Sequence, residues 1–184
     1  MELVVPSLDR LAQYADALRR GWSPDNIRLE EAAKEHLAEI ARDAAAFVAR
    51  ADDREAKGGD ITLPDGTKVA RLPGFVRWMW DGEFCGQIGF RWQPGTEALP
   101  PHCLGHIGYA VVPWKRGRGY ATRALGLMLA EARKKGLRWV ELTTDPDNEP
   151  SQRVISRNGG VFVERFKAQA AYGDRDELRW RIVL

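Results

Sequence analysis

A glycine-rich, basic turn in the second half of the chain has the residue types of an anion-binding site. It reads Pro113-Trp114-Lys115-Arg116-Gly117-Arg118-Gly119-Tyr120-Ala121-Thr122. Because glycine has no Cβ, successive backbone N–H groups can converge on an anion at Gly117 and Gly119. The residues that follow predict a helix, whose first N–H groups and positive dipole end also attract an anion. With Lys115, Arg116 and Arg118 beside them, these groups favour a diphosphate.

Two common phosphate-binding motifs fit this turn poorly. A P-loop ends in Gly-Lys followed by Ser or Thr, whereas this turn has Gly119-Tyr120-Ala121, so ATP chemistry of that kind is not expected. The dinucleotide motif Gly-x-Gly-x-x-Gly fits only halfway, because Thr122 occupies its third glycine position. Asp145, after the next expected strand, has the place of a ribose-binding acid, so a nicotinamide dinucleotide-binding enzyme stays an alternative.

The net charge of +2 hides an uneven distribution. Residues 1–74 hold 11 Lys and Arg against 14 Asp and Glu, whereas residues 75–184 hold 17 against 12. The segment 115–138 alone holds eight basic residues and one acid, Glu131. A solvated helix face is the ordinary explanation of such a segment, but here the charge coincides with the glycine-rich turn. Because the pI is only about 8.6, we expect no nucleic-acid partner.

Length and composition fit one globular domain. The chain has 184 residues, of which 44% are hydrophobic and 29% charged, and no run of 18 apolar residues predicts a membrane span. Cys85 and Cys103 form no CxxC pair, which fits a reducing, cytoplasmic location. His102 and His106 enter a strand and would lie about 13 Å apart, so we expect no metal site.

Periodicity predicts a helical start followed by alternating strands and helices. Residues 7–20 and 27–51 have helical apolar spacing, with Ser7 and Asn26 as expected caps, and residues 58–74 are expected to be mostly loop. A hairpin turning at Asp81-Gly82 should join strands 76–80 and 83–92. The other strands are expected at 105–112, 137–144, 161–166 and 178–184, and the other helices at 120–135 and 148–158.

This order of elements predicts an α/β (α+β) fold. We expect a mixed, mostly antiparallel twisted sheet flanked by helices, with one central βαβ crossover from strand 105–112 to strand 137–144. Such a crossover places the glycine-rich turn and the following helix N-terminus at one end of the sheet.

Three segments together match the motifs of one known family. Arg116-Gly117-Arg118-Gly119-Tyr120-Ala121 fits a pattern of Gln or Arg, then x-x-Gly-x, then Gly or Ala. Residues 105–113 are similar to the strand that leads into that family's cofactor loop. Asn148, Ser151, Val154 and residues 158–160 are similar to its next helix and glycine turn. Over residues 75–166 the chain therefore resembles the GNAT superfamily of acyl-CoA-dependent N-acetyltransferases, and the three segments in register are more specific than one motif.

The resemblance implies a GNAT-like single domain with splayed strands and with acetyl-CoA as acyl-donor co-substrate. The backbone of Val111 and Val112 would pair with the pantetheine arm of the donor, and the side chain of Asn148 would reach it. A backbone N–H near Val111 would polarise the thioester carbonyl, and the acceptor amine would attack directly. The implied cofactor-binding residues are Val111, Val112, Arg116, Gly117, Arg118, Gly119, Tyr120, Ala121, Thr122 and Asn148.

The same resemblance divides the chain by role. Residues 1–184 would form one acyltransferase domain, in which residues 1–74 are mainly helical and lie on the acceptor side. Residues 75–166 would form the cofactor-binding core, and residues 167–184 a C-terminal loop and strand.

Two proton transfers need residues of their own. His106 lies where relatives often carry Glu, so it is a candidate base, with a structural histidine as the alternative. Relatives often place a tyrosine on the helix after Asn148 to protonate the leaving thiolate, but the matching position here is Ile155. Ser151 is the candidate replacement, beside Ser156 and water, and a thiolate of pKa near 8.5 also leaves with little help.

We therefore expect an N-acetyltransferase that moves an acetyl group to a primary amine on a small molecule or a peptide. An acyl-CoA-binding sensor with little catalysis is the alternative that the isoleucine at position 155 would fit. Dimers are frequent among similar proteins, so a homodimer is also an expectation.

Overall fold

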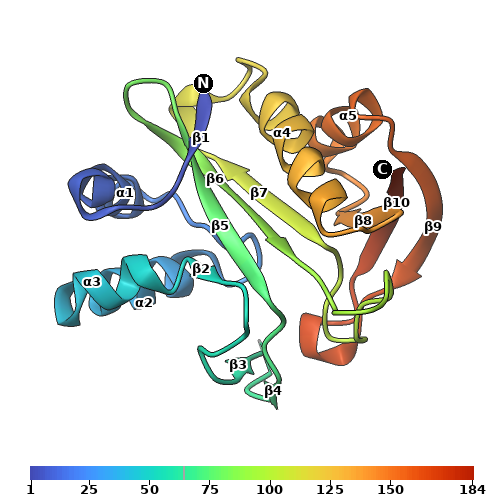
Figure 1. The fold of residues 1–184 in the computed structure, drawn as a ribbon, viewed down its shortest axis with the longest axis horizontal. Helices are drawn as coiled ribbons and strands as arrows, with labels where there is room; N and C mark the ends of the chain where they lie inside the picture. Colours follow the sequence, from blue (N-terminus) through green and yellow to red (C-terminus); the bar gives the residue numbers. More distant parts are fainter. Residues whose placement is uncertain (64) are drawn as a thin grey trace.

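Two separate β-sheets form the centre of the protein. The computed structural model describes residues 1–63 and 65–184 (Figure 1). The first sheet has the order β1-β5-β6-β7 with β2 also paired to β5, and the second has the order β8-β10-β9. The pairings within both sheets are antiparallel. The strands are β1 (Glu2–Val4), β2 (Asp52–Asp53), β5 (Gly74–Trp80), β6 (Phe84–Arg91), β7 (Ile107–Val111), β8 (Trp139–Thr144), β9 (Val161–Lys167) and β10 (Asp176–Val183).

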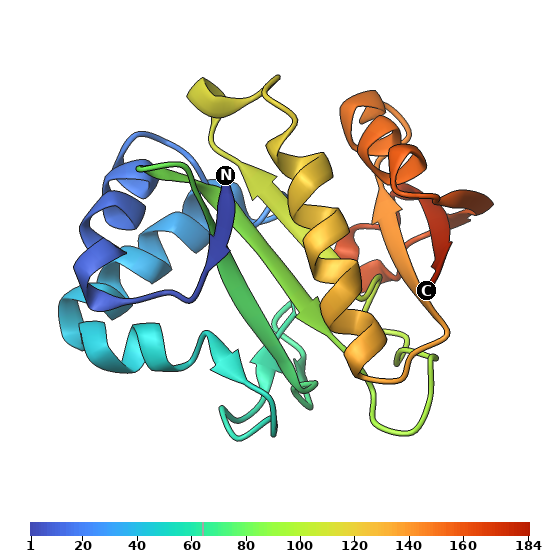
Figure 2. The ribbon, with the colours of Figure 1, turned by 45° about the horizontal axis from the view of Figure 1, so that its top comes forward.

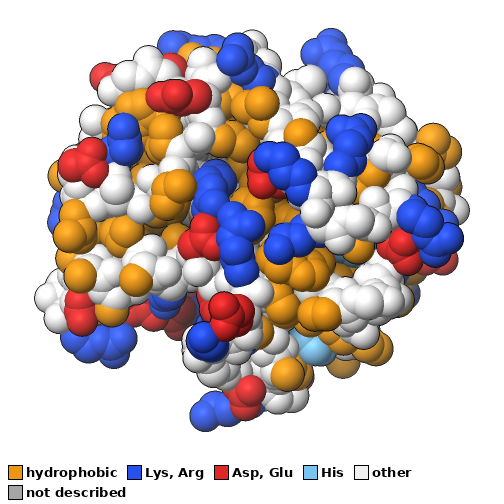
Figure 3. Space-filling view, in the orientation of Figure 1, with side chains coloured by type: hydrophobic (Ala, Val, Ile, Leu, Met, Phe, Trp, Pro, Cys, Tyr) orange, Lys and Arg blue, Asp and Glu red, His pale blue; other side chains and the backbone are white. Residues whose placement is uncertain are grey.

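Helices lie on both sides of the first sheet. In Figure 1 this sheet separates α1, α2 and α3 from α4 and α5. Figure 3 shows hydrophobic side chains in the hollow between these two helical groups, with Lys and Arg side chains lying across it. The helices are α1 (Leu11–Arg19), α2 (Leu29–Arg42), α3 (Ala44–Ala49), α4 (Tyr120–Lys134) and α5 (Glu149–Arg157), and short 3-10 turns lie at Leu8–Arg10, Pro113–Lys115 and Ala170–Tyr172.

Each face of the first sheet has its own hydrophobic core. On the α4 side, Ile88 of β6 and Met128 of α4 belong to one buried cluster, which extends to Ile182 of β10 in the second sheet. On the opposite side, Tyr14 of α1 stacks on Trp78 of β5, with ring centroids 5.0 Å apart. These two cores fix the N-terminal helices and the crossover helix on opposite faces of the same strands.

The elements expected from residue 75 onward are confirmed, and so is the α/β fold of mostly antiparallel strands flanked by helices, although these strands form two antiparallel sheets instead of one mixed sheet. The β5–β6 hairpin turns at Asp81 and Gly82, and β7, α4 and β8 form the expected crossover. None of the helices in the described part of the chain has the length and apolar character needed to span a bilayer.

The N-terminal part differs from expectation in its helix caps and in one helix break. Ser7 makes no side-chain cap bond, and a 3-10 turn at Leu8–Arg10 precedes α1, which begins at Leu11. The single helix expected over residues 27–51 is two helices, because Asp43 is extended with φ −158° and its Oδ1 accepts a hydrogen bond from Ala46 N at 2.9 Å. The first of these helices is entered through Asp25 rather than Asn26, since Asp25 Oδ1 accepts from Ile27 N at 2.7 Å. A short aspartate that bonds to a nearby amide competes with helix continuation.

Short strands were also not expected. β1 has three residues and adds to the edge of β5, and β2 has two. Within the expected loop 58–74, β3 (Ile61–Thr62) pairs with β4 (Lys68–Val69), whereas Pro64 lies outside the described residues. Segments this short carry almost no periodic signal.

The two sheets touch where β7 and β8 begin and then part. His106 N, just before β7, donates to Glu141 O of β8 at 2.7 Å. A Cβ on Gly105 would lie 3.1 Å from the same carbonyl oxygen, so the backbones are close there. Further along, β7 pairs with β6 and β8 pairs with β10, and Figure 2 shows α4 lying over the gap between β7 and β8. The expected splayed strands are therefore observed.

Candidate active site

The loop between β7 and α4 has the backbone of an anion cradle. Gly117 and Gly119 both have φ of +74°, a conformation that glycine adopts readily and other residues rarely do. A Cβ built on either glycine would meet no atom within 4 Å, so the surface of the loop is open there. Gly119 precedes the first helical residue, Tyr120, and the first N–H groups of an α-helix have no carbonyl partner within the helix. The residues present thus fit a diphosphate.

The charge of the cradle comes from two arginines rather than three basic residues. Arg116 and Arg118 are exposed on the loop. Lys115, in contrast, is buried, and its Nζ lies 3.0 Å from Asp81 Oδ1 and 2.9 Å from Glu83 Oε2. These two carboxylates neutralise the lysine. The expectation that Lys115 adds charge at the anion site is therefore wrong, because its ammonium group points into the protein.

Val111, the last residue of β7, and Val112, which follows it, turn their backbone N–H groups in opposite directions. Val112 N donates to Cys85 O of β6 at 3.0 Å, so the amide of Val112 is used within the first sheet. Val111 O accepts a hydrogen bond from Arg116 Nε at 3.3 Å. Because successive residues of a strand turn their backbone groups to opposite sides, the N–H of Val111 faces away from β6, toward the gap beside β8.

Asn148 and Ser151 lie together at the start of α5. Asn148 caps this helix, since its Oδ1 accepts from Ser151 N at 3.1 Å. The cap uses the amide oxygen, and the NH2 group is the part of the side chain left to donate to a ligand. Asn148 is thus placed at the end of the gap to which the glycine loop also belongs.

A tyrosine on β7 completes this region. Tyr109 OH lies 2.7 Å from Ser151 Oγ, so the pair joins β7 to α5 across the gap between the two sheets. Burial raises the pKa of Tyr109 to about 12, so the phenol is protonated at neutral pH. Ile155, one turn beyond Ser151, is fully buried in the core on the α4 side. Position 155 thus offers no hydroxyl group, whereas the hydroxyl groups of Tyr109 on β7 and Ser151 on α5 lie side by side.

His106 lies at the junction of the two sheets and is fully buried. Its Nδ1 accepts a hydrogen bond from Glu141 N at 3.0 Å, and its Nε2 has no hydrogen-bond partner among the described residues. Burial lowers the pKa of His106 to about 4, although the carboxylate of Glu141 acts in the opposite direction. The imidazole is therefore neutral at pH 7 and holds the strands β7 and β8 together where they meet.

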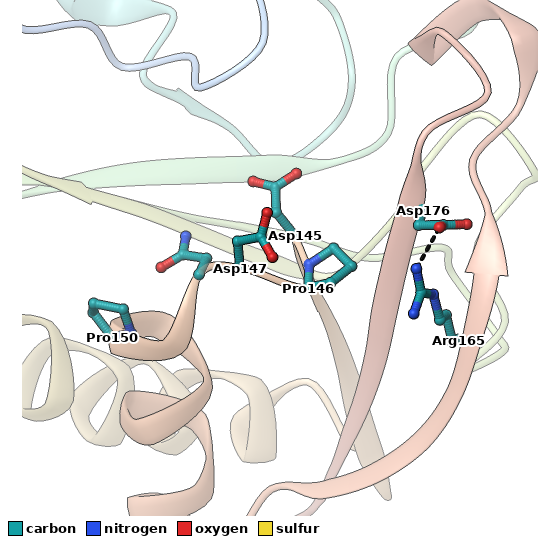
Figure 4. A pocket seen from close by; sticks show the side chains of 7 residues that line it. Asp145, Pro146, Asp147, Pro150, Arg165 and Asp176 are labelled. Atoms are coloured by element: carbon teal, nitrogen blue, oxygen red, sulfur yellow. Dashed lines mark hydrogen bonds and ion pairs between the residues drawn. The ribbon is translucent and has the colours of Figure 1, made fainter.

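A cavity of about 700 Å³ lies beside Asn148. Figure 4 shows Asp145 and Asp147 on the loop after β8, while Arg165 of β9 pairs with Asp176 of β10. The lining residues are Asp145, Pro146, Asp147, Asn148, Pro150, Arg165 and Asp176. Asp176 pairs with Lys167 as well as Arg165, and Asp145 Oδ1 lies 3.6 Å from Arg175 Nη1, so neighbouring cations balance two of the three lining carboxylates. Within residues 1–63 and 65–184, no group of three or more His, Cys, Asp or Glu side chains is arranged to hold a metal ion.

The structure thus brings together residues 111–122, Asn148 and Ser151, and it places His106 at the buried base of the gap. Two participants were not expected, Asp81 and Tyr109. Asp81 bonds to Lys115 and Tyr109 bonds to Ser151, and each pair is separated by more than 30 positions in the sequence. The sequence predicts the turn at Asp81-Gly82 and the strand that contains Tyr109, but it does not predict the side-chain contacts of Asp81 and Tyr109.

The crossover helix α4 begins directly after the left-handed glycine loop and lies over the gap between two parting strands, β7 and β8, which is the arrangement that the resemblance to acyl-CoA-dependent transferases implies. The family model described as "Acetyltransferase (GNAT) domain" matches residues 8–161. That match covers most of the chain, and the protein therefore belongs to the GNAT acetyltransferase family. A search of curated protein sequences found no match.

Solved structures of acetyltransferases share the fold over nearly the whole chain. The microcin self-immunity acetyltransferase MccE, solved with acetyl-CoA and AMP, is 14% identical with a TM-score of 0.64, over 99% of this chain and 91% of that one. The ribosomal alpha-N-protein acetyltransferase RimL, solved with coenzyme A, is 16% identical with a TM-score of 0.63, over 99% and 93%. The spermidine N-acetyltransferase SpeG of Vibrio cholerae is 12% identical with a TM-score of 0.58, over 100% and 95%. At these identities the likeness shows a common fold.

Proposed function

We propose that this protein is an N-acetyltransferase that moves an acetyl group from acetyl-CoA to a primary amine by direct attack. The observation that carries the proposal is the pair of left-handed glycines, Gly117 and Gly119, at the N-terminus of α4 beside the gap between β7 and β8. MccE and RimL, which share the fold, were solved with acetyl-CoA and coenzyme A respectively. The exposed arginines of the loop supply the positive charge that a diphosphate needs.

The proposal assigns a role to each part of the loop and strand. The amides of residues 117–121 hold the diphosphate, with Arg116, Arg118 and Thr122 around it. Val111 lies along the pantetheine arm, and the NH2 group of Asn148 donates to it. Val112, expected beside the arm as well, is buried and uses its N–H on Cys85 O and its carbonyl on Lys115 N, so its backbone is not left to pair with the arm. When bound, acetyl-CoA supplies the acetyl group as an activated thioester. The N–H of Val111 is oriented to stabilise negative charge that develops on the carbonyl oxygen.

The acceptor that we propose is a cationic primary amine on a small molecule or peptide. Its support is the carboxylate of Asp147 in the cavity beside Asn148, since the other two lining carboxylates, Asp145 and Asp176, are paired with arginine side chains. An ammonium group must lose a proton before it attacks, so a base or a water chain is required. The base role of His106 stays a prediction; with a pKa of about 4, its imidazole is a weak base.

We further propose that Ser151 donates the proton to the leaving thiolate, with the phenol of Tyr109 behind it. The two hydroxyl groups are 2.7 Å apart, so a proton given up by one can be replaced from the other.

A reducing, cytoplasmic location and a homodimer complete the proposal. Both cysteines, Cys85 and Cys103, are buried and free, which fits the location.

Replacing Ser151 with alanine is expected to lower kcat about tenfold, and Tyr109→Phe should have a similar effect. The expected loss is smaller than that of a typical general acid, because a thiolate is already a good leaving group. Steady-state kinetics with saturating acetyl-CoA measure the change. Ser156→Ala tests the other serine that the sequence offers for this role, and because Ser156 is exposed on the same helix we expect its kcat to stay unchanged. An unchanged kcat in Ser151→Ala would remove this residue from the mechanism.

Acetyl-CoA is expected to raise the melting temperature of the protein by roughly 5–11 °C at 100 times its dissociation constant, because such binding adds about 2.7 kcal/mol to the stability. NADH and ATP, measured side by side, should raise it little. Stabilisation by NADH without any by acetyl-CoA would contradict the proposal and favour the dinucleotide enzyme. Stabilisation by acetyl-CoA without thioester consumption on a broad amine panel would favour the sensor.

A further inference from the structure

Asp81 lies at the turn of the β5–β6 hairpin and contacts the glycine loop from outside. Its Oδ1 and Oδ2 lie 3.0 and 3.1 Å from Lys115 Nζ. Its Oδ2 also accepts a hydrogen bond from Tyr120 OH at 2.6 Å. The same carboxylate therefore holds two side chains that are five positions apart in the sequence.

These two side chains lie on either side of the cradle. Lys115 ends the 3-10 turn before the loop, and Tyr120 is the first residue of α4 after it. Only residues 116–119 lie between them, and they include both left-handed glycines. A single carboxylate thus joins the entry and the exit of the loop to a hairpin that belongs to another part of the sheet.

The ion pair and hydrogen bonds of Asp81 are largely excluded from solvent, which strengthens them. Its side chain is 14% exposed and that of Lys115 is 10% exposed. Hydrogen bonds from Tyr120 and Lys115 hold the pKa of Asp81 well below its usual range, against the effect of burial. The carboxylate is therefore ionised at neutral pH, and charge-assisted hydrogen bonds of this kind are stronger than neutral ones.

We propose that Asp81 is a positioning residue that preforms the acetyl-CoA cradle by holding the loop 116–119 at both ends. The inference rests on the proposed function for the identity of the ligand, but the fixed shape of the loop can be measured without it. A loop that is already in its binding conformation loses less freedom when the ligand binds. The hydrogen bonds of Asp81 go to the side chains of Lys115 and Tyr120 rather than to residues 116–119, so Asp81 acts on the loop through these two residues.

Asp81→Asn is expected to raise the KM and the dissociation constant for acetyl-CoA about tenfold. This increase corresponds to a loop that adopts the binding conformation about a tenth of the time. Because the reacting groups lie elsewhere, kcat at saturating acetyl-CoA and the KM for the amine should stay within twofold. Tyr120→Phe removes the hydrogen bond between Tyr120 and Asp81 but keeps the ion pair with Lys115, so it should raise the KM and the dissociation constant for acetyl-CoA by less.

The matched control is Asp52→Asn. Asp52 pairs with Arg54 and Arg77 at 2.6 and 2.7 Å, beside the first residues of β5, whereas Asp81 follows the last ones. This control loses comparable ion pairs in the same sheet without touching the loop. If Asp52→Asn raises the KM for acetyl-CoA as much as Asp81→Asn does, the effect is general destabilisation and the inference is overturned.

Hydrogen exchange of the amides of Arg116 and Arg123, which donate to Pro113 O and Gly119 O at the two ends of the loop, separates the inference from the proposed function when it is measured without ligand. These amides should exchange at least tenfold faster in Asp81→Asn than in the wild type or Asp52→Asn. If the wild type binds no acetyl-CoA, the proposed function fails. Faster exchange in Asp81→Asn would in that case still support the positioning role. Unchanged exchange in Asp81→Asn would overturn the positioning role, whatever the wild type binds.

Discussion

Replacing Gly119 with valine is expected to abolish acetyl-CoA binding while the protein stays folded. Gly119 has φ of +74°, and a β-branched residue in that conformation costs roughly 1–2 kcal/mol or more. The loop would relieve this strain by leaving its conformation, and the amides before Tyr120 would no longer converge. We expect at least a hundredfold loss of affinity, measured by calorimetry and by the absence of thermal stabilisation with acetyl-CoA.

Gly136→Val is the matched control for this prediction. Gly136 has φ of +76° and, like Gly119, open space where a Cβ would lie, but it follows the other end of α4. Both variants therefore carry the same backbone strain at opposite ends of one helix. Gly136→Val should lose stability and keep its affinity for acetyl-CoA. A Gly119→Val protein that still binds within a few-fold of wild type would exclude the loop as the diphosphate site.

Acidification is expected to destabilise the protein through His106. Burial lowers the pKa of this imidazole from its ordinary 6.5 to about 4 in the folded protein, so the unfolded chain binds more protons between these values. The contribution of His106 to stability is therefore complete above about pH 6.5 and is lost as the pH falls toward 4. Linkage gives a loss of about 2 kcal/mol at pH 5, or roughly 4–8 °C in melting temperature.

His106→Asn isolates this effect, because an asparagine carbonyl can accept the bond from Glu141 N without titrating. The variant should lose less stability than the wild type between pH 7 and pH 5 in thermal melts. His36→Asn is the necessary companion, since burial also lowers the pKa of His36 to about 4. Equal losses in the wild type and in His106→Asn would show that the buried imidazole is not the acid-sensitive group.

Much of the fold could be predicted because its signals are local. The Asp81-Gly82 turn, the strand β10 and the helix expected over residues 148–158 each depend on residues within a few positions. The break of the N-terminal helix at Asp43 was missed because apolar spacing continues across it, and only the bond from the aspartate to Ala46 N interrupts the backbone. The three-residue strand β1 is stabilised by pairing with β5 rather than by its own sequence.

The site divides in the same way. The conformations of Gly117 and Gly119 follow from the residue type, so the loop was predictable. The inward orientation of Lys115 was not, because it depends on a carboxylate 34 positions earlier. The partnership of Tyr109 with Ser151 likewise arises only when the two sheets meet. Charge counted along the sequence therefore overstated the positive charge at the loop.

The burial of Ile155 restricts how this protein can evolve. Its side chain is fully enclosed, and a Cβ on Gly160 would lie only 2.3 Å from Ile155 Cγ2. A mutation to tyrosine at this position would have to insert a larger, polar side chain into a space with no room for it, at a cost of about 1–3 kcal/mol or more. A tyrosine at this position would therefore require compensating changes in the residues around it.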